Sequence, residues 1–190
     1  MPKPDRFAKF WPLGLLGLAL TLTLGGCETL QQLPIPAWLQ PPAQSPAQPA
    51  AKPTPQSTSL AKMEAEVYQG INQIRQKNRL PQFRQNEKLA AVARNYSRRM
   101  AEQRFFAHTS PQGDTMVERV RSAGIFYFML GENLFTSTNI PQPAKAAITG
   151  WMNSPGHRDN ILNPVYREMG IGVWKRGNTY YFTQLFMRAL

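Results

Sequence analysis

Four stretches of the chain carry apolar residues at the three- and four-residue spacing of an amphipathic helix. The first runs from Leu60 to Asn78 and ends before Pro81, which cannot continue a helix. The second follows Asn86, a favourable N-cap residue, and extends to about Gln103. The two shorter stretches are Met116 to about Gly124, capped by Asp114 or Thr115, and Ala144 to Met152, preceded by Pro143 in its first turn.

The pattern changes after Pro164, where apolar and small residues alternate along the chain. Residues 169–174 and 179–186 predict two strands, and the turn-forming residues 175–178 between them predict a β-hairpin. A third strand is expected over Leu130–Phe135. Helices followed by a small antiparallel sheet with helices on its faces indicate an α+β fold.

The first residues of the chain have the pattern of an export signal. Three basic residues and one acidic residue in positions 1–9 precede a charge-free run from Trp11 to Leu24, which is too short to span a membrane comfortably. The run ends in Leu24-Gly25-Gly26-Cys27, which resembles the lipobox of bacterial lipoproteins. We therefore predict a signal peptide over residues 1–26 and lipidation of Cys27; the alternative is an ordinary cleaved signal.

Residues 27–59 are rich in Pro, Ala and Gln, and eleven of the 17 prolines lie before residue 60. Such a segment has too few apolar residues to offset the entropy lost on ordering, so we expect a flexible tether. Residues 60–190 then form one domain. Because Cys27 is the single cysteine, this domain has no disulfides, no thiol catalysis and no cysteine-based zinc site.

The domain is basic, with 18 Lys and Arg against 9 Asp and Glu, a net charge of +9. Its expected partners are acidic: anionic lipid or a cell-wall polymer. The alternative is a solvated basic face that aids solubility. Nucleic acid is not expected, because the arginines lie on predicted helices without interleaved aromatic residues and the domain is exported.

Candidate chemistry is limited to a few residues. The chain has two histidines, His108 and His157, both in segments that look like loops, and Glu132 lies within an apolar strand where its charge needs a partner. Two imidazoles and one carboxylate can hold zinc or another divalent metal, and can equally bind a ligand without metal or form a buried structural network. Ser110 and Ser154, each near a histidine in sequence, leave a Ser-His-Glu hydrolase as an alternative.

The segments around these residues resemble the CAP, or SCP-like, domain of cysteine-rich secretory proteins, insect venom antigens of the allergen V5 type and plant pathogenesis-related proteins, especially its bacterial branch. The resemblance extends from about Glu66 to Phe186. Its most specific segments are Phe106-Ala107-His108-Thr109-Ser110-Pro111, Gly131-Glu132-Asn133-Leu134 and Trp151-Met152-Asn153-Ser154-Pro155-Gly156-His157-Arg158-Asp159-Asn160-Ile161-Leu162.

The resemblance implies an α-β-α sandwich with a small antiparallel sheet between helices, in which His108, Glu132 and His157 share one cleft. Eukaryotic members often carry a second glutamate at the position of Ser154, so the set of four is reduced to three here. The expected function is ligand binding by a CAP-domain protein of the bacterial cell envelope, extracytoplasmic and lipid-anchored, with a cleft for a divalent metal. The alternative is an envelope hydrolase of peptide or wall polymer that uses metal-bound water or a serine.

A five-residue apolar run, Phe126-Tyr127-Phe128-Met129-Leu130, lies between two glycines. One interpretation is a buried connector. The other is a groove for a lipid or another apolar small ligand, which the resemblance favours because eukaryotic members bind lipids and sterols.

Overall fold

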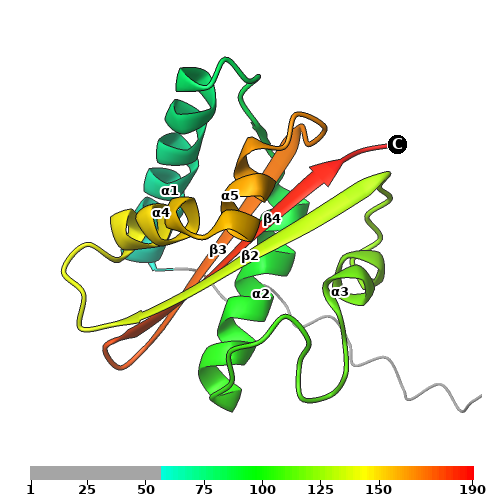
Figure 1. Cartoon of the computed structure of the whole chain (residues 1–190). Coiled ribbons are helices and arrows are strands. Elements are labelled where there is room, and N and C mark those ends of the chain that lie inside the picture. Colours follow the sequence, from blue (N-terminus) through cyan, green and yellow to red (C-terminus); the bar gives the residue numbers. More distant parts are fainter. Residues whose placement is uncertain (1–56) are drawn as a thin grey trace, which may run out of the picture. The chain divides into compact units, whose positions relative to one another are not determined.

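The computed structural model describes residues 57–190, which lie within one compact unit, Ala50–Leu190. The predictions for residues 1–26, for Cys27 and for the tether up to residue 56 therefore lie outside the described residues. The elements in chain order are α1 (Thr58–Lys77), β1 (Arg84–Gln85), α2 (Glu87–Gln103), α3 (Met116–Ser122), β2 (Met129–Thr138), α4 (Pro143–Asn153), α5 (Pro155–Leu162), β3 (Glu168–Arg176) and β4 (Thr179–Arg188) (Figure 1).

The strands form one sheet in the order β1-β3-β4-β2. The predicted hairpin is β3 and β4, with Gly177 at a positive φ of 57° in the turn. β2 pairs antiparallel with β4 along its whole length, from Met129 opposite Arg188 to Thr138 opposite Thr179. The α+β prediction is confirmed, with one addition: the two-residue strand β1 pairs parallel to β3, so the sheet is mixed at that edge.

Helices cover both faces of this sheet. α2 packs on one face against β3 and β4, and α1, α4 and α5 cover the other face (Figure 1). The contact between α2 and β3 is close because β3 carries glycine there: a Cβ at Gly172 would lie 2.1 Å from the backbone nitrogen of Arg94. The layers are therefore those of an α-β-α sandwich.

The predicted helices are present, with ends that differ by a few residues. Ser57 caps α1, so the helix begins just before Leu60. Asn86 caps α2 through its side chain, and Thr115 caps α3 in a capping box with Glu118. Within residues 57–190, no helix combines the length and the apolar character needed to cross a membrane.

Two local predictions were wrong. The segment around His157, expected to be a loop, is the helix α5, in which Pro155 occupies the first turn where a missing N–H costs nothing. The strand predicted over Leu130–Phe135 is too short, because Thr136–Thr138 continue β2 and pair with Tyr181–Thr179. Both corrections affect the site, because α5 and β2 position two of its residues.

Candidate functional site

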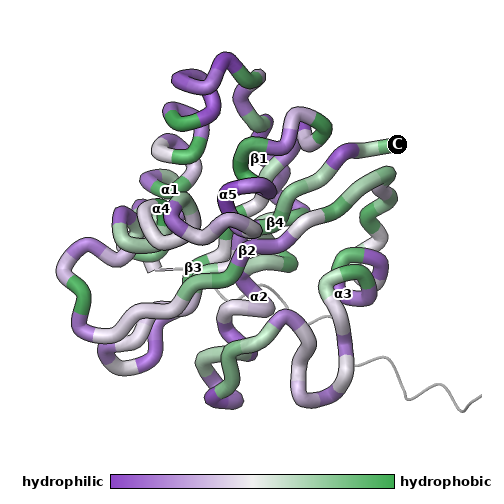
Figure 2. Tube along the Cα trace, in the orientation of Figure 1, coloured by the Kyte–Doolittle hydropathy of each residue, from purple (hydrophilic) through white to green (hydrophobic). Residues whose placement is uncertain are grey.

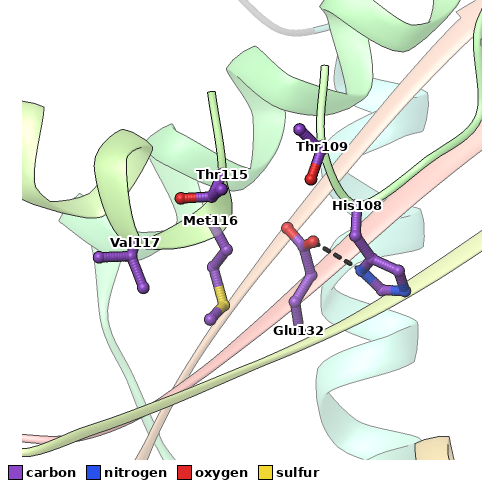
Figure 3. Close-up of a pocket in the computed structure, with 6 residues that line it drawn as sticks. All are labelled: His108, Thr109, Thr115, Met116, Val117 and Glu132. Carbon is purple, nitrogen blue, oxygen red and sulfur yellow. Dashed lines mark hydrogen bonds and ion pairs between the residues drawn. The ribbon is translucent and has the colours of Figure 1, made fainter. Parts of the chain in front are cut away.

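The centre of the site is the contact between Glu132 and His108. Glu132 lies on β2, where its side chain is only 3% exposed, and its Oε1 is 2.8 Å from Nδ1 of His108 (Figure 3). His108 lies between α2 and α3 with its side chain 60% exposed. A buried carboxylate on the rigid sheet thus holds an exposed imidazole at the surface.

The charge that compensates Glu132 comes from Arg119 on α3. Its Nη2 donates to Oε2 of Glu132 at 2.7 Å, and the Arg119 side chain is 6% exposed. The guanidinium lies over the ring of Tyr96, 3.3 Å from the ring centroid, and its Nη1 also donates to the backbone oxygens of His108 and Asp114. One arginine therefore neutralises the carboxylate and fixes the segment that carries the imidazole.

Asp114 secures the same segment from the other side. Its carboxylate accepts hydrogen bonds from both terminal nitrogens of Arg99 and from the hydroxyl of Ser110. Burial raises the pKa of Asp114, but the bonds from Arg99 and Ser110 and the charges of Arg99 and Arg119 outweigh this effect and lower it to about 2. The aspartate is ionised across the physiological range and keeps the segment 108–114 in place.

The two histidines have opposite pKa shifts. The hydrogen bond to Glu132 raises the pKa of His108 above its ordinary value, although burial opposes the shift. Burial lowers the pKa of His157, and the charge of His108 lowers it further. His108 is thus the first of the pair to take up a proton.

His157 is positioned by α5, which a polar network attaches to β2. Asn133, fully buried next to Glu132, donates from Nδ2 to the backbone oxygen of His157 and to Oε1 of Gln184, both at 3.0 Å. Asn160 of α5 donates to Oδ1 of Asn133 at 2.9 Å and to the backbone oxygen of Glu132 at 3.3 Å. The network fixes the backbone of His157 relative to Glu132 and leaves the imidazole half-buried.

An open cavity of about 290 Å³ adjoins the His108–Glu132 pair. Its lining is part polar and part apolar: His108, Thr109, Thr115, Met116, Val117 and Glu132 (Figure 3). Of the three predicted cleft residues, His108 and Glu132 line this cavity. His157 is not among the lining residues.

The three predicted residues do not form a ready set of three metal ligands. Both carboxylate oxygens of Glu132 are already engaged, one by His108 and one by the positive guanidinium of Arg119. Among residues 57–190, no group of three or more His, Cys, Asp and Glu side chains is arranged to hold a metal ion. Glu132 is therefore committed to His108 and Arg119 rather than left open as a ligand.

The two serines considered as nucleophiles lie in different settings. Ser110 is buried, and its hydroxyl donates to Asp114 rather than to an imidazole. Ser154 joins α4 to α5, where its backbone N–H donates to Trp151 and closes α4. A Ser-His-Glu arrangement needs a hydroxyl bonded to the imidazole, and Ser110 does not supply it.

Sequence reasoning missed Arg119, which it placed among the arginines of a basic surface. Glu132 lies in an apolar strand, so its charge requires a nearby cation, and the short helix before this strand contains arginines. These two facts together could have pointed to Arg119. Asn160 lies in a segment that carries the family resemblance, but its role was not predicted because the helix α5 was not predicted.

Comparison with known proteins identifies the family. Residues 68–186 match the family model described as "CAP: Cysteine-rich secretory protein family". The chain belongs to the CAP family. This CAP chain is 34% identical over 130 residues to YkwD of Bacillus subtilis (strain 168), a match that covers 68% of this chain and 49% of YkwD. It is 31% identical over 125 residues to the B. subtilis membrane protein YlbC, covering 66% of this chain and 34% of YlbC.

Solved structures agree with the CAP assignment. The chain is similar to an extracellular protein of Bacillus anthracis str. Ames that contains a SCP domain, with a TM-score of 0.63 and 28% identity over 71% of this chain and 45% of the other. It has the fold of an outer surface protein of Borrelia burgdorferi, with a TM-score of 0.62 and 23% identity over 72% of this chain and 97% of the other. The chain spans half or less of the curated relatives' lengths.

Proposed function

We propose that this CAP domain is a ligand-binding module that acts outside the cytoplasm and captures its ligand at the imidazole of His108. The observation that carries the proposal is the chain of contacts Arg119–Glu132–His108, in which two buried, oppositely charged groups hold one exposed imidazole beside an open cavity. A buried charge pair is costly to assemble, and this pair orients a single solvent-facing group.

The geometry defines what the imidazole can do. With Nδ1 bonded to the Glu132 carboxylate, the neutral ring keeps its proton on Nδ1, and Nε2 carries the lone pair. Nε2 can then accept a hydrogen bond or bind a metal. After protonation, favoured by the raised pKa, the ring donates from Nε2 to an acidic group. Met116 and Val117 of α3 supply an apolar wall for the rest of the ligand.

For the divalent metal expected from the sequence we propose a different set of ligands. We assign its protein ligands to the imidazoles of His108 and His157, and Glu132 to the orienting role on Nδ1 of His108. A zinc ion bound there would supply positive charge to polarise and attract an acidic ligand. The engagement of both Glu132 oxygens supports the orienting role of this carboxylate.

Zinc titration calorimetry on the piece Ala50–Leu190 tests this assignment. We expect one zinc per chain, loss of binding in His108→Ala and in His157→Ala, and affinity about 10- to 100-fold weaker in Glu132→Gln, the range for removal of an outer-shell partner. Lys145→Ala, an exposed change on α4, is the matched control. Unchanged zinc affinity in His108→Ala would contradict the assignment.

Binding is favoured over catalysis because Ser110, one candidate nucleophile, is bonded to Asp114. The hydrolase alternative predicts that the domain releases soluble fragments from purified cell wall and that His108→Ala abolishes the release. We expect sedimentation with the wall, partly retained in His108→Ala, and no release of fragments. Fragment release that depends on His108 would replace the binding proposal with the hydrolase.

The proposed location rests on the N-terminal signal and on the relatives. The similar Bacillus anthracis protein is described as extracellular, and YlbC as a membrane protein. Together with the predicted signal peptide and Cys27, these support a domain anchored by lipid to the outer side of a bacterial membrane, near anionic lipid or wall polymer. Fractionation of cells with wild-type chain and Cys27→Ala tests it: the wild type should sediment with membranes, and the variant should be released.

A further inference from the structure

Two aromatic side chains project into solvent between α3 and β2. Phe126 is 79% exposed and Phe128 is 69% exposed, whereas Ile125 before them is buried and Tyr127 between them is half-buried. The segment adjoins the start of β2 beside the C-terminal end of β4 (Figure 1) and is the apolar stretch that leads into β2 in Figure 2. The interpretation of this segment as a buried connector is therefore wrong for both phenylalanines.

The backbone below these rings is fixed. The N–H of Ile125 donates to Val120 of α3, and the N–H of Phe128 donates to Arg188 of β4 at 2.8 Å. Ile125 packs in a cluster with Val120, Leu185 and Met187, and Tyr127 packs against the same cluster. The two phenylalanines are thus exposed on a turn whose backbone is held in place by hydrogen bonds and by the packing of Ile125 and Tyr127.

The charged residues within the turn and the adjoining chain segments are basic. Arg121 on α3 and Arg188 on β4 are exposed, and they lie on the two elements that flank the turn. Residues 119–131 and 185–190, which supply the turn and its neighbours, contain no Asp or Glu. We call these two arginines, together with Phe126 and Phe128 of the turn, the aromatic–basic patch.

We propose that the aromatic–basic patch docks on an anionic lipid bilayer, with Phe126 and Phe128 at the boundary between headgroups and acyl chains and the two arginines on the phosphates. Adjacent exposed apolar side chains mark an interaction site, and cations beside them match an anionic membrane surface. Wall polymer offers phosphate or carboxylate but no apolar phase for the rings. A second copy would place two positive patches against each other.

The patch is separate from the ligand cleft, although α3 contributes to both. Thr115, Met116 and Val117, at the start of α3, line the cavity, whereas Arg121 of the patch lies in the last turn and the two phenylalanines follow it. The proposal does not rest on Cys27 or on ligand binding at His108. Its failure would leave the proposed function intact, and the reverse also holds.

Vesicle co-sedimentation of the piece Ala50–Leu190, which lacks Cys27, tests the proposal. We expect binding to vesicles of phosphatidylglycerol and phosphatidylcholine, and weak binding to phosphatidylcholine alone. Phe126→Ser with Phe128→Ser should lower the partition coefficient about tenfold or more, given the apolar area withdrawn from water. Phe106→Ser, a change of a phenylalanine that is 48% exposed on another connection, should leave it unchanged. Arg121→Gln with Arg188→Gln should lower binding and its salt dependence.

Thermal unfolding of each variant accompanies the assay, so that loss of binding is scored only for folded protein. Equal sedimentation of wild type and the double phenylalanine variant would overturn the proposal, as would the absence of binding to anionic vesicles. A dimer of the wild-type piece that the phenylalanine substitutions dissociate would assign the patch to a second copy and also overturn it.

Discussion

Nη2 of Arg119 donates to Oε2 of Glu132 at 2.7 Å, and both side chains are almost fully buried. The pair joins α3 to β2 directly below the exposed imidazole of His108. Two charges taken out of water stabilise a fold only when each satisfies the other. Removal of either partner alone is therefore expected to lower the free energy of unfolding by more than the intact pair contributes to it.

Arg119→Met leaves Glu132 as an uncompensated buried charge and should lower the free energy of unfolding by about 3–5 kcal/mol. Adding Glu132→Gln to this variant removes the stranded charge and should restore part of the loss. Arg121→Met, an exposed position on the same helix, is the control and should change stability little. Urea denaturation measures all four proteins; equal loss in the two arginine variants would contradict the compensation argument.

Gly172→Ala tests the close approach of α2 to β3. The added Cβ would lie 2.1 Å from the backbone nitrogen of Arg94 and 2.2 Å from the carbonyl carbon of Ala93, so a helix backbone would have to move. We expect a loss of about 3 kcal/mol or more, in the upper range for overpacking. At Gly156 on α5, an added Cβ would meet open space and the backbone φ is not positive. Gly156→Ala should therefore leave stability unchanged or raise it slightly. Similar melting temperatures for the two variants would rule out the predicted clash.

Arg75 is a fully buried guanidinium that interacts with backbone oxygens. Nε donates to Pro81, and Nη1 donates to Ile161 and Asn163 at 2.7 and 2.9 Å, which connects α1 to the C-terminal end of α5. Burial, with repulsion from Arg167, lowers the pKa of Arg75 to about 10. Arg75→Met should cost about 3 kcal/mol or more, because buried carbonyls lose their donors. Lys77 on the same helix is exposed, so Lys77→Met should change the free energy of unfolding little. Comparable losses of stability in the two variants would refute the role of the three carbonyl contacts.

The lowered pKa of Asp114 predicts a stability change in acid. The carboxylate ionises with a pKa of about 2 in the folded chain, below its ordinary value of 3.8, so the folded state favours the charged form. The stabilisation is complete when the pH is above the ordinary pKa of the carboxyl group. It is lost as the pH falls toward the pKa of Asp114 in the folded chain. Because Asp114 is partly exposed, solvent screening weakens its interactions. We therefore expect the free energy of unfolding of the wild type to exceed that of Asp114→Asn by only about 1 kcal/mol at neutral pH. This difference should shrink between about pH 5 and pH 2 in urea titrations; a constant difference would contradict it.

The sequence was informative where residue type and spacing act locally. Asn86 predicted the start of one helix and the pair Asp114 and Thr115 that of another, with Thr115 the actual cap. The alternation in residues 169–174 predicted β3. Caps and strand periodicity depend on near neighbours. The proximity of His108 and Glu132 came from the family resemblance, since 24 residues separate them in sequence and only the fold brings them together.

Features that depend on tertiary context were not predicted. Arg119 looked like its neighbour Arg121, and only the direction of a seven-residue helix distinguishes the buried arginine from the exposed one. The helix α5 contains Gly156 and lacks an apolar stripe, so its pattern favoured a loop. The apolar segment at Phe126 suggested burial, because hydropathy alone does not distinguish a ring in the core from one displayed on a supported turn.

The central claim is that Glu132 holds Nδ1 of His108 and leaves Nε2 for the ligand. It is tested most directly by nitrogen NMR of the two imidazoles in Ala50–Leu190 during addition of Zn²⁺, with His157→Ala to assign the signals. We predict that Nδ1 of His108 stays protonated while Nε2 of His108 and a ring nitrogen of His157 shift together and saturate at one zinc per chain. Zinc-dependent loss of the Nδ1 proton of His108, or no shift of either ring, would contradict the claim.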